Sequence, residues 1–309
     1  MKLLWTTGVL WGILSGVVIG QDIRTWTSED GRTMEGELRE FTEEEVRVMR
    51  RSDLNIVTIP LEKLSEDDQA YVRSLLIGEA RADGLKEGPY AEMITGEFVR
   101  STTEGGMPFQ FWGSPDFKKG EEYPLVLALH GGGTRGGDED WPPGTAATIW
   151  TKEELQEERP CFVVAPRCPE DKSWRGEYGD KAAALVRALS DALPIDRNRI
   201  YVTGSSLGGG GSWYQISSHQ DLYAGTVLMA NGGPVPDLET FKDFPIWQFH
   251  GELDVDTPVD GARKMAEAME KAGASNYEYT ELKGAPHSVG GLVYPDVKVQ
   301  EWLFSQSRE

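Results

Sequence analysis

A serine between two glycines carries the chemistry that this sequence indicates most directly. The stretch from Arg199 to Gly209 begins as an apolar, β-branched run typical of a buried strand and ends as G-x-S-x-G around Ser206. A strand and a helix can pass close together at such a turn only if small residues lie two positions before and after the serine, and Gly204 and Gly208 supply them. The pattern predicts a nucleophile lifted clear of a sheet. The alternative interpretation is an ordinary glycine-rich turn.

A serine hydroxyl needs a neighbouring base, and the base needs a carboxylate to orient it. The chain has four histidines: His130, His219, His250 and His287. His287 is the one that falls in a loop after the last predicted strand, and hydrolases of this topology have the order nucleophile, acid, base along the chain. We therefore predict that His287 is the base, in preference to a lone surface histidine.

Carboxylates suited to the acid follow the predicted strand that ends at His250. The carboxyl ends of parallel strands meet at one edge of a sheet, and ligand chemistry collects there. Asp254 and Asp256 both qualify on these grounds, and Glu252 is a weaker third choice. The spacing leaves the two aspartates open.

The elements that must position these residues alternate between strand and helix. Tyr123–Leu129 is an unbroken apolar run, as expected for a strand buried on both faces of a mostly parallel sheet. Further strands are predicted at 162–166, 199–203, 225–230, 246–250 and 277–282, and helices at 151–158, 178–193, 207–218, 259–271 and 296–306. The alternation predicts an α/β fold with a doubly wound, mostly parallel sheet over residues 96–309.

A glycine run follows the apolar strand Tyr123–Leu129. In His130-Gly131-Gly132-Gly133 no side chains obstruct the backbone N–H groups of the glycines, so these groups can approach an anion. A flexible loop without such a role is the alternative.

The N-terminal part of the chain predicts export and a separate small module. Residues 1–20 resemble a secretory signal, with Lys2, an apolar run and a small-residue site before Gln21, although an uncleaved membrane anchor is the alternative. We expect a secreted or periplasmic protein without membrane association after cleavage.

Residues 21–77 show four short strand patterns at 24–27, 33–41, 46–50 and 55–60, then a helix capped by Ser65, which predicts a small β-barrel. Residues 78–95, rich in glycine and mixed charges, are the predicted linker.

The net charge of −20 bears on partners and says little about the fold. A chain this acidic is repelled by DNA, RNA and anionic lipid surfaces, so we expect none of them as a partner.

Two cysteines, Cys161 and Cys168, flank the predicted strand at 162–166. An exported protein can form disulfides, but an extended segment between these two would hold the sulfurs too far apart unless the chain folds back. We expect buried thiols at least as readily as a bridge.

Taken together, the motifs of residues 95–305 resemble the α/β-hydrolase superfamily. The matching segments are 204–209 (GSSLGG), 250–254 (HGELD), 284–287 (GAPH) and 163–169 before Trp174. The group they resemble most is the carboxylesterase, phospholipase-like and predicted-peptidase group, with the sugar-ester and polyester hydrolases. A prolyl-oligopeptidase-like peptidase is therefore an alternative to an esterase.

Carried over by position, this resemblance implies a catalytic triad of Ser206 as nucleophile, Asp254 rather than Asp256 as acid, and His287 as base. It also implies an oxyanion hole formed by the N–H of Leu207 with that of Gly132 or Gly133. The implied chemistry is acyl transfer to water and requires no metal and no organic cofactor.

The N-terminal module resembles the small Src-homology-3-like domain first named in an endocytic actin-patch adaptor and common at the front of exported planctomycete proteins. The matching segments are 24–27, 30–31, 57–65 and 68–72. Some members of that family bind peptides, so a peptide partner is one use that the resemblance implies. A structural or spacer role is the other.

The sequence thus predicts an exported serine esterase that acts on small-molecule or polysaccharide esters, such as acetylated or feruloylated polysaccharides. Trp141 and Trp174, with Trp112 and Trp213, offer rings that could stack on sugars or aryl groups, or that could serve as core or loop anchors. A binding protein with an inert hydrolase fold is the non-enzymatic alternative.

Overall fold

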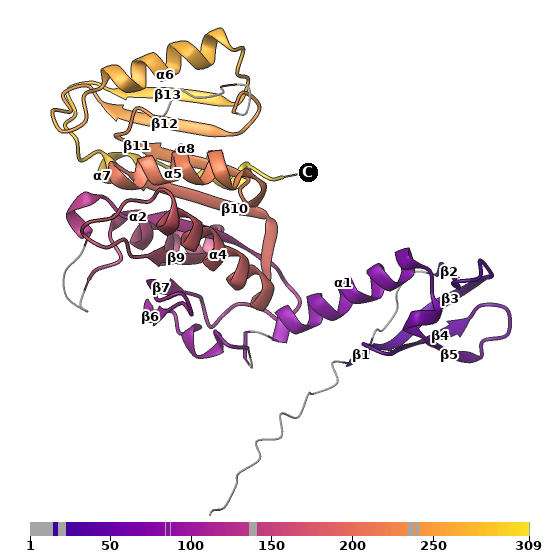
Figure 1. Ribbon diagram of the computed structural model, residues 1–309. Helices are drawn as coiled ribbons and strands as arrows, with labels where there is room; N and C mark the ends of the chain where they lie inside the picture. The colour runs from indigo at the N-terminus through magenta and orange to yellow at the C-terminus, as the bar shows by residue number, and fades with distance from the viewer. Residues whose placement is uncertain are drawn as a thin grey trace, which may run out of the picture. The chain divides into compact units, whose positions relative to one another are not determined.

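The structure, a computed structural model, describes residues 15–17, 23–83, 85–86, 88–135, 141–233, 238 and 241–308 (Figure 1). The chain divides into two compact units, residues 1–83 and 84–309. In the described part of the chain, every helix is too short or too polar to cross a membrane. Apart from residues 15–17, the predicted signal segment lies outside the described residues.

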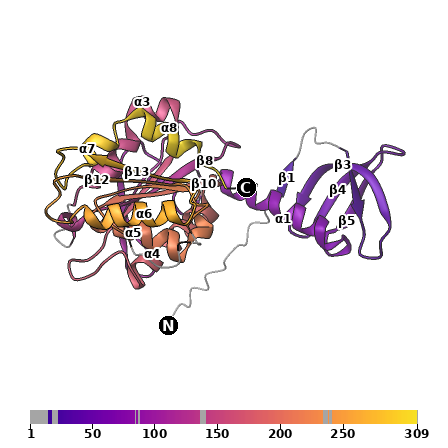
Figure 2. The same ribbon diagram turned by 90° about the horizontal axis from the view of Figure 1, so that it is seen from above.

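The first unit contains an antiparallel sheet, which Figure 2 shows together with its helix. Its strands are β1 (Ser15–Val17), β2 (Arg24–Thr27), β3 (Thr33–Thr42), β4 (Glu45–Arg50) and β5 (Ile56–Pro60). The long strand β3 pairs with β1, β2 and β4, and β4 pairs with β5. The four strands predicted from the sequence are confirmed. The predicted closed barrel is not seen, because no ladder in the described residues joins β5 to β1 or β2.

A 3-10 turn, η1 (Leu61–Lys63), leads from β5 into the helix α1 (Glu66–Asp83). The helix packs on the sheet through one apolar core, made of Trp26, Leu38, Phe41, Val46, Val48, Leu61, Leu64, Val72 and Leu76. Because α1 continues to Asp83, residues 78–83 of the predicted linker are helical.

A buried carboxylate joins the start of α1 to the sheet. Asp68 is 2% exposed and accepts hydrogen bonds from the backbone N–H of Thr27 at 2.7 Å and from Nη2 of Arg24 at 2.6 Å. The Arg24 guanidinium also lies 3.9 Å from the ring centroid of Tyr71. The amide of Asp68 donates to Oγ of Ser65 at 3.3 Å, which confirms the predicted helix cap.

We predict that Asp68→Ala destabilises the first unit by about 3 kcal/mol, because it leaves a buried amide and a cation unpaired. Hydrogen exchange of the full chain, followed by mass spectrometry, should show faster exchange in β2–β5. Asp67→Ala is the matched control, since Asp67 is exposed on the same helical turn. Equal exchange in both variants would contradict the role given to Asp68.

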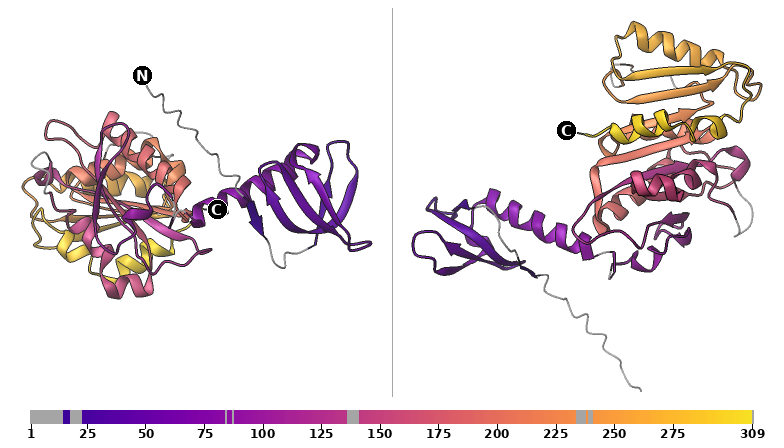
Figure 3. Two further views of the ribbon diagram at one scale, coloured as in Figure 1. Left: turned by 90° about the horizontal axis from the view of Figure 1, so that it is seen from below. Right: turned by 180° about the vertical axis from the view of Figure 1, so that it is seen from behind.

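The second unit is built on an eight-stranded sheet with the order β13-β12-β11-β10-β8-β9-β7-β6 (Figure 1, Figure 3). Its strands are β6 (Val99–Thr102), β7 (Pro108–Trp112), β8 (Tyr123–Leu129), β9 (Phe162–Pro166), β10 (Ile195–Ser205), β11 (Gly225–Met229), β12 (Ile246–Gly251) and β13 (Tyr277–Leu282). The strands β8 to β13 run parallel, whereas β7 pairs antiparallel with both β6 and β9. The carboxyl ends of β8, β10, β12 and β13 therefore share one edge.

Helices cover both faces of this sheet, as Figure 2 shows in an edge-on view. One face carries α4 (Glu177–Ala192), α5 (Leu207–Ser218) and α6 (Asp260–Lys271), and the other carries α2 (Thr145–Thr148), α3 (Glu153–Glu158), α7 (Gly290–Val293) and α8 (Val297–Ser305). In β8, Leu125 and Leu127 pack into the first core and Val126 and Ala128 into the second. The unbroken apolar run thus reflects burial on both faces, and the doubly wound sheet is confirmed.

Candidate active site

Ser206 forms the sharp turn between β10 and α5. Its backbone has φ 58° and ψ −116°, a left-handed conformation that is strained for any residue other than glycine. Two contacts hold it there: the N–H of Ser206 donates to the carbonyl of Met229 at 2.9 Å, and Nδ2 of Asn231 donates to the carbonyl of Ser206 at 3.2 Å.

The flanking glycines allow strand, turn and helix to approach closely. A Cβ atom on Gly204 would lie 2.5 Å from the carbonyl carbon of Gly208, and one on Gly208 would overlap the carbonyl oxygen of Leu129. Both positions therefore require glycine. This close approach brings the start of α5 against the end of β8.

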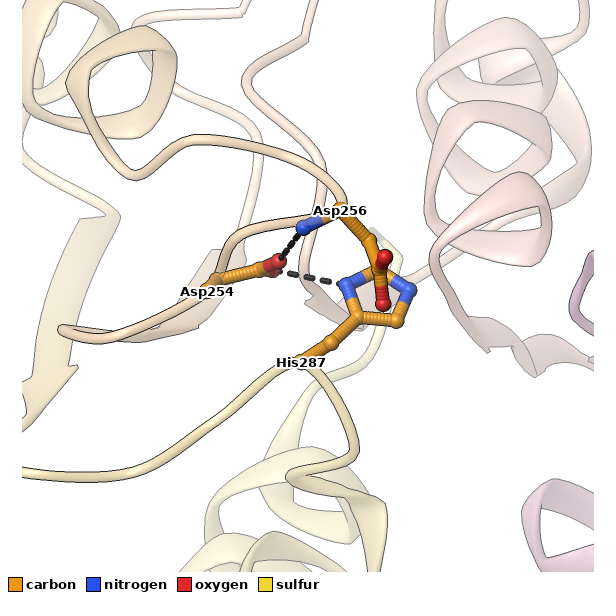
Figure 4. A group of neighbouring side chains, drawn as sticks. All are labelled: Asp254, Asp256 and His287. Atoms are coloured by element: carbon orange, nitrogen blue, oxygen red, sulfur yellow. Dashed lines mark hydrogen bonds and ion pairs between the residues drawn. The ribbon is translucent and has the colours of Figure 1, made fainter.

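The acid and the base predicted from the sequence are in contact. Nδ1 of His287 donates to Oδ2 of Asp254 at 2.7 Å, and the other oxygen of Asp254 accepts the backbone N–H of Asp256 at 3.0 Å (Figure 4). That oxygen also accepts the backbone N–H of Thr257 at 2.8 Å. The side chain of Asp254 is fully buried, and that of His287 is 21% exposed. Of the two aspartates left open by spacing, Asp254 is the one hydrogen-bonded to the imidazole. The third choice, Glu252, accepts from the amide of Gly284 instead.

The environment of Asp254 favours its ionised form. Burial by itself raises the pKa of this carboxyl, but the hydrogen bonds from the Thr257 amide and the His287 imidazole outweigh burial and hold the pKa below its ordinary value. An ionised Asp254 fixes the proton of His287 on Nδ1 and leaves Nε2 free to accept a proton.

Asp254, Asp256 and His287 are also a set of side chains that can bind metal, because one ligand atom from each lies within 4.8 Å of the others. Ligands of a tetrahedral zinc ion are about 3.3 Å apart, as follows from bonds of about 2.0 Å. The 2.7 Å separation between His287 and Asp254 is shorter and is typical of a charge-assisted hydrogen bond. The geometry therefore fits an acid–base pair better than a metal centre.

The glycine loop after β8 lies beside the serine. A Cβ atom on Gly131 would be 3.9 Å from Cβ of Ser206, and Gly132 begins the 3-10 turn η3 (Gly132–Thr134). Leu207 is the first residue of α5, where N–H groups have no acceptor within the helix. The backbone segments expected to form an oxyanion hole thus flank the same side chain.

His130 holds the glycine loop in place through hydrogen bonds of its neutral imidazole. Its Nε2 accepts the backbone N–H of Cys168 at 3.0 Å, so its proton is on Nδ1, 2.8 Å from the carbonyl oxygen of Gly131. Burial lowers the pKa of His130, in agreement with a neutral ring. His130 therefore has a structural role in the loop.

Trp174 and Trp141, which we expected either to contact substrate or to anchor loops, are both buried. Trp174 is fully buried, and its indole N–H donates to the carbonyl of His130 at 3.0 Å. Trp141 is 7% exposed, and its ring lies 5.3 Å from the guanidinium of Arg167. Since neither offers a free ring face to a ligand, both serve as anchors of loops.

Cys161 and Cys168 are free and buried, so the buried-thiol interpretation is confirmed. Burial raises the pKa of the Cys161 thiol to about 12 and that of the Cys168 thiol to about 11. Neither cysteine is suited to act as a nucleophile.

One polar residue of the site was not identified from the sequence. His250, treated there only as the end of a strand, is fully buried with Nε2 3.1 Å from Oδ2 of Asp254. The sequence did contain a clue to this contact. His250 lies only four residues before Asp254, and Gly251 between them allows the tight turn that brings the two side chains together.

Parallel pairing places the serine and the Asp254–His287 pair at one edge of the sheet. Ser205 is in register with Met229 of β11, which is in register with Phe249 of β12. Among the described residues, no hydrogen bond joins the Ser206 hydroxyl to His287. In serine hydrolases the bond between nucleophile and base is often long or poorly aligned in the absence of substrate.

Comparisons with known proteins identify similar esterases. No protein-family model matches the chain. Two curated relatives are both called "Probable feruloyl esterase C": the one from Aspergillus terreus is 28% identical over 155 residues, 48% of this chain and 56% of the relative. The one from Aspergillus niger is 25% identical over 198 residues, 58% of this chain and 71% of the relative.

A solved structure described as a thermostable esterase is 32% identical, with a TM-score of 0.64 over 70% of this chain and 64% of that chain. The chain thus spans less than two thirds of that esterase and of the Aspergillus terreus relative. The likeness, with the mixed sheet and its helices, shows that the second unit has the α/β-hydrolase fold.

The close contact between the loops of Asp254 and His287 can be tested by adding a side chain to Gly251. A methyl group on Gly251 would overlap the carbonyl oxygen of Pro286, so we predict that Gly251→Ala destabilises the protein by about 1–3 kcal/mol in urea denaturation. Gly291→Ala is the control, because nothing lies within 4 Å of the added atom. A Gly251→Ala variant as stable as the control would show that the loops do not need this contact.

The lowered pKa of Asp254 predicts a pH dependence of stability. A carboxyl whose pKa is lowered in the folded protein stabilises it above the unfolded value of about 3.9, and this contribution is lost as the pH falls through the folded pKa. The difference in unfolding free energy between the wild type and Asp254→Asn should therefore shrink below about pH 4. Urea denaturation across pH, with the exposed Asp256→Asn as control, measures it; a constant difference for Asp254→Asn would refute the prediction.

Proposed function

We propose that the second unit is a serine esterase, with Ser206 as nucleophile, His287 as base and Asp254 as the acid that orients the base. The observation that carries this proposal is the 2.7 Å hydrogen bond between His287 and Asp254, at the same sheet edge as the strained turn of Ser206. Export directed by residues 1–20 is part of the proposal, and it rests on the sequence pattern alone.

The reaction is acyl transfer from an ester to water. Oγ of Ser206 attacks the ester carbonyl carbon while Nε2 of His287 takes the hydroxyl proton and then returns it to the leaving alcohol. Backbone N–H groups of Leu207 and of Gly132 or Gly133 stabilise the negative charge on the carbonyl oxygen. Water, activated by the same imidazole, then releases the acid and restores Ser206.

The substrate that we propose carries an aromatic acyl group, such as a feruloyl ester of a polysaccharide. The names of the two Aspergillus relatives support this choice. Exposed apolar side chains lie in the loop of Asp254 and in α7, which follows the loop of His287: Leu253 is 61%, Val255 87% and Leu292 61% exposed. Exposed apolar side chains of this kind suit contact with an aryl group.

We predict that Ser206→Ala lowers the turnover of p-nitrophenyl acetate and of methyl ferulate by at least about a thousandfold, because it removes the group that forms the acyl-enzyme. Ser205→Ala is the matched control, one residue away at the end of β10, and should retain activity. Initial-rate kinetics and labelling of Ser206 by a fluorophosphonate probe measure both effects.

The same assay distinguishes the alternatives. Turnover of a peptide anilide in excess of the aryl esters would favour a peptidase. A wild-type protein that neither hydrolyses these substrates nor reacts with the probe would show that the hydrolase fold is inert.

A further inference from the structure

A second histidine contacts the proposed acid from inside the protein. His250 lies in β12 and is fully buried. Its Nε2 is 2.8 Å from the carbonyl oxygen of Thr257 and 3.1 Å from Oδ2 of Asp254. His250 thus meets Asp254 from the side of the sheet, and His287 meets the same oxygen from the loop after β13.

The partners of His250 define where its proton lies. A carbonyl oxygen can only accept, so Nε2 must carry the hydrogen and donate it to the carbonyl of Thr257. Oδ2 of Asp254 lies 3.1 Å from the same nitrogen, as a close polar contact. The other ring nitrogen, Nδ1, is buried and has no hydrogen-bond partner among the described residues. The imidazole of His250 therefore makes its polar contacts through Nε2 alone.

An apolar side chain of similar size would fill the same space without leaving a buried nitrogen unpaired, which is destabilising. Packing alone therefore does not account for a histidine here. The donor at Nε2 is the feature that an apolar residue would lack.

We propose that His250 is a positioning residue that holds the carboxylate of Asp254 in the orientation in which Oδ2 meets Nδ1 of His287. Nε2–H of His250 holds the carbonyl of Thr257, and the amide of Thr257 donates to Oδ1 of Asp254, so the hydrogen bond of His250 fixes the turn that holds the carboxylate. The 3.1 Å contact between Nε2 and Oδ2 also limits rotation of the carboxylate away from His287. This inference rests on the proposed function, in which His287 is the base. His250 does not touch the substrate.

The test compares two substitutions that differ in the donor. In His250→Gln the side-chain amide reaches the place of Nε2–H, whereas His250→Leu fills the space without a donor. We expect His250→Leu to lower kcat for p-nitrophenyl acetate by about 10- to 100-fold with little change in KM, the size typical of lost hydrogen bonds behind a catalytic group. His250→Gln should recover most of kcat.

Phe249→Leu is the packing control, because Phe249 is the buried neighbour of His250 in β12 and belongs to the core on one face of the sheet. It should lower the melting temperature and leave kcat close to that of the wild type. If His250→Leu does not fold, His250→Asn replaces it, since its shorter amide does not reach the position of Nε2.

A proton NMR signal from Nδ1–H of His287 provides a readout that does not depend on turnover. This signal should shift or broaden in His250→Leu and stay unchanged in Phe249→Leu. Wild-type kcat and an unshifted signal in His250→Leu, or an equal loss of kcat in the Gln and Leu variants, would overturn the role of His250. Failure of the proposed function is distinct, because Ser206→Ala would then hydrolyse the ester as fast as the wild type.

Discussion

The hydrogen bond between Asp254 and His287 depends on the close approach of the loops that follow the neighbouring strands β12 and β13. In β12 and β13, Gly251 is in register with Leu282, and the missing side chain of Gly251 lets the backbone at Pro286 lie against it. The loops of Asp254 and His287 are therefore held together by backbone packing, independently of their side chains. Because the loops are fixed, the carboxylate and the imidazole are already positioned for their 2.7 Å hydrogen bond.

Three histidines of the second unit have different roles because their hydrogen-bond partners differ. His130 accepts an amide N–H and lies next to a carbonyl, so it is a fixed neutral group. His250 donates through one nitrogen and is fully buried, whereas His287 is partly exposed and keeps Nε2 free of partners among the described residues. Only the last combination suits proton transfer to a substrate.

The sequence predicts the α/β order, the turn at Ser206 and the loop position of His287 after the last strand, because each follows from a local pattern: an apolar run, a glycine spacing and the order along the chain. Spacing alone does not predict which aspartate binds His287, since both Asp254 and Asp256 follow β12 closely. The resemblance to hydrolases implies Asp254, and Asp254 is the residue hydrogen-bonded to His287. The sequence does not predict the contact of His250 with Asp254 and leaves open whether Trp174 contacts substrate or anchors a loop, because both depend on packing between distant segments. The end of α1 at Asp83 was missed because charged residues and a glycine are compatible with either a helix or a linker.

The two unpaired, buried cysteines have a practical consequence for producing the protein. Because no covalent crosslink contributes to the fold, the second unit can reach its native state in a reducing cytoplasm as well as in an oxidising compartment. The high pKa of both thiols and their lack of solvent contact also protect them from air oxidation during purification. Recombinant material made in a reducing cytoplasm should therefore have the same tertiary structure as material made in an oxidising compartment.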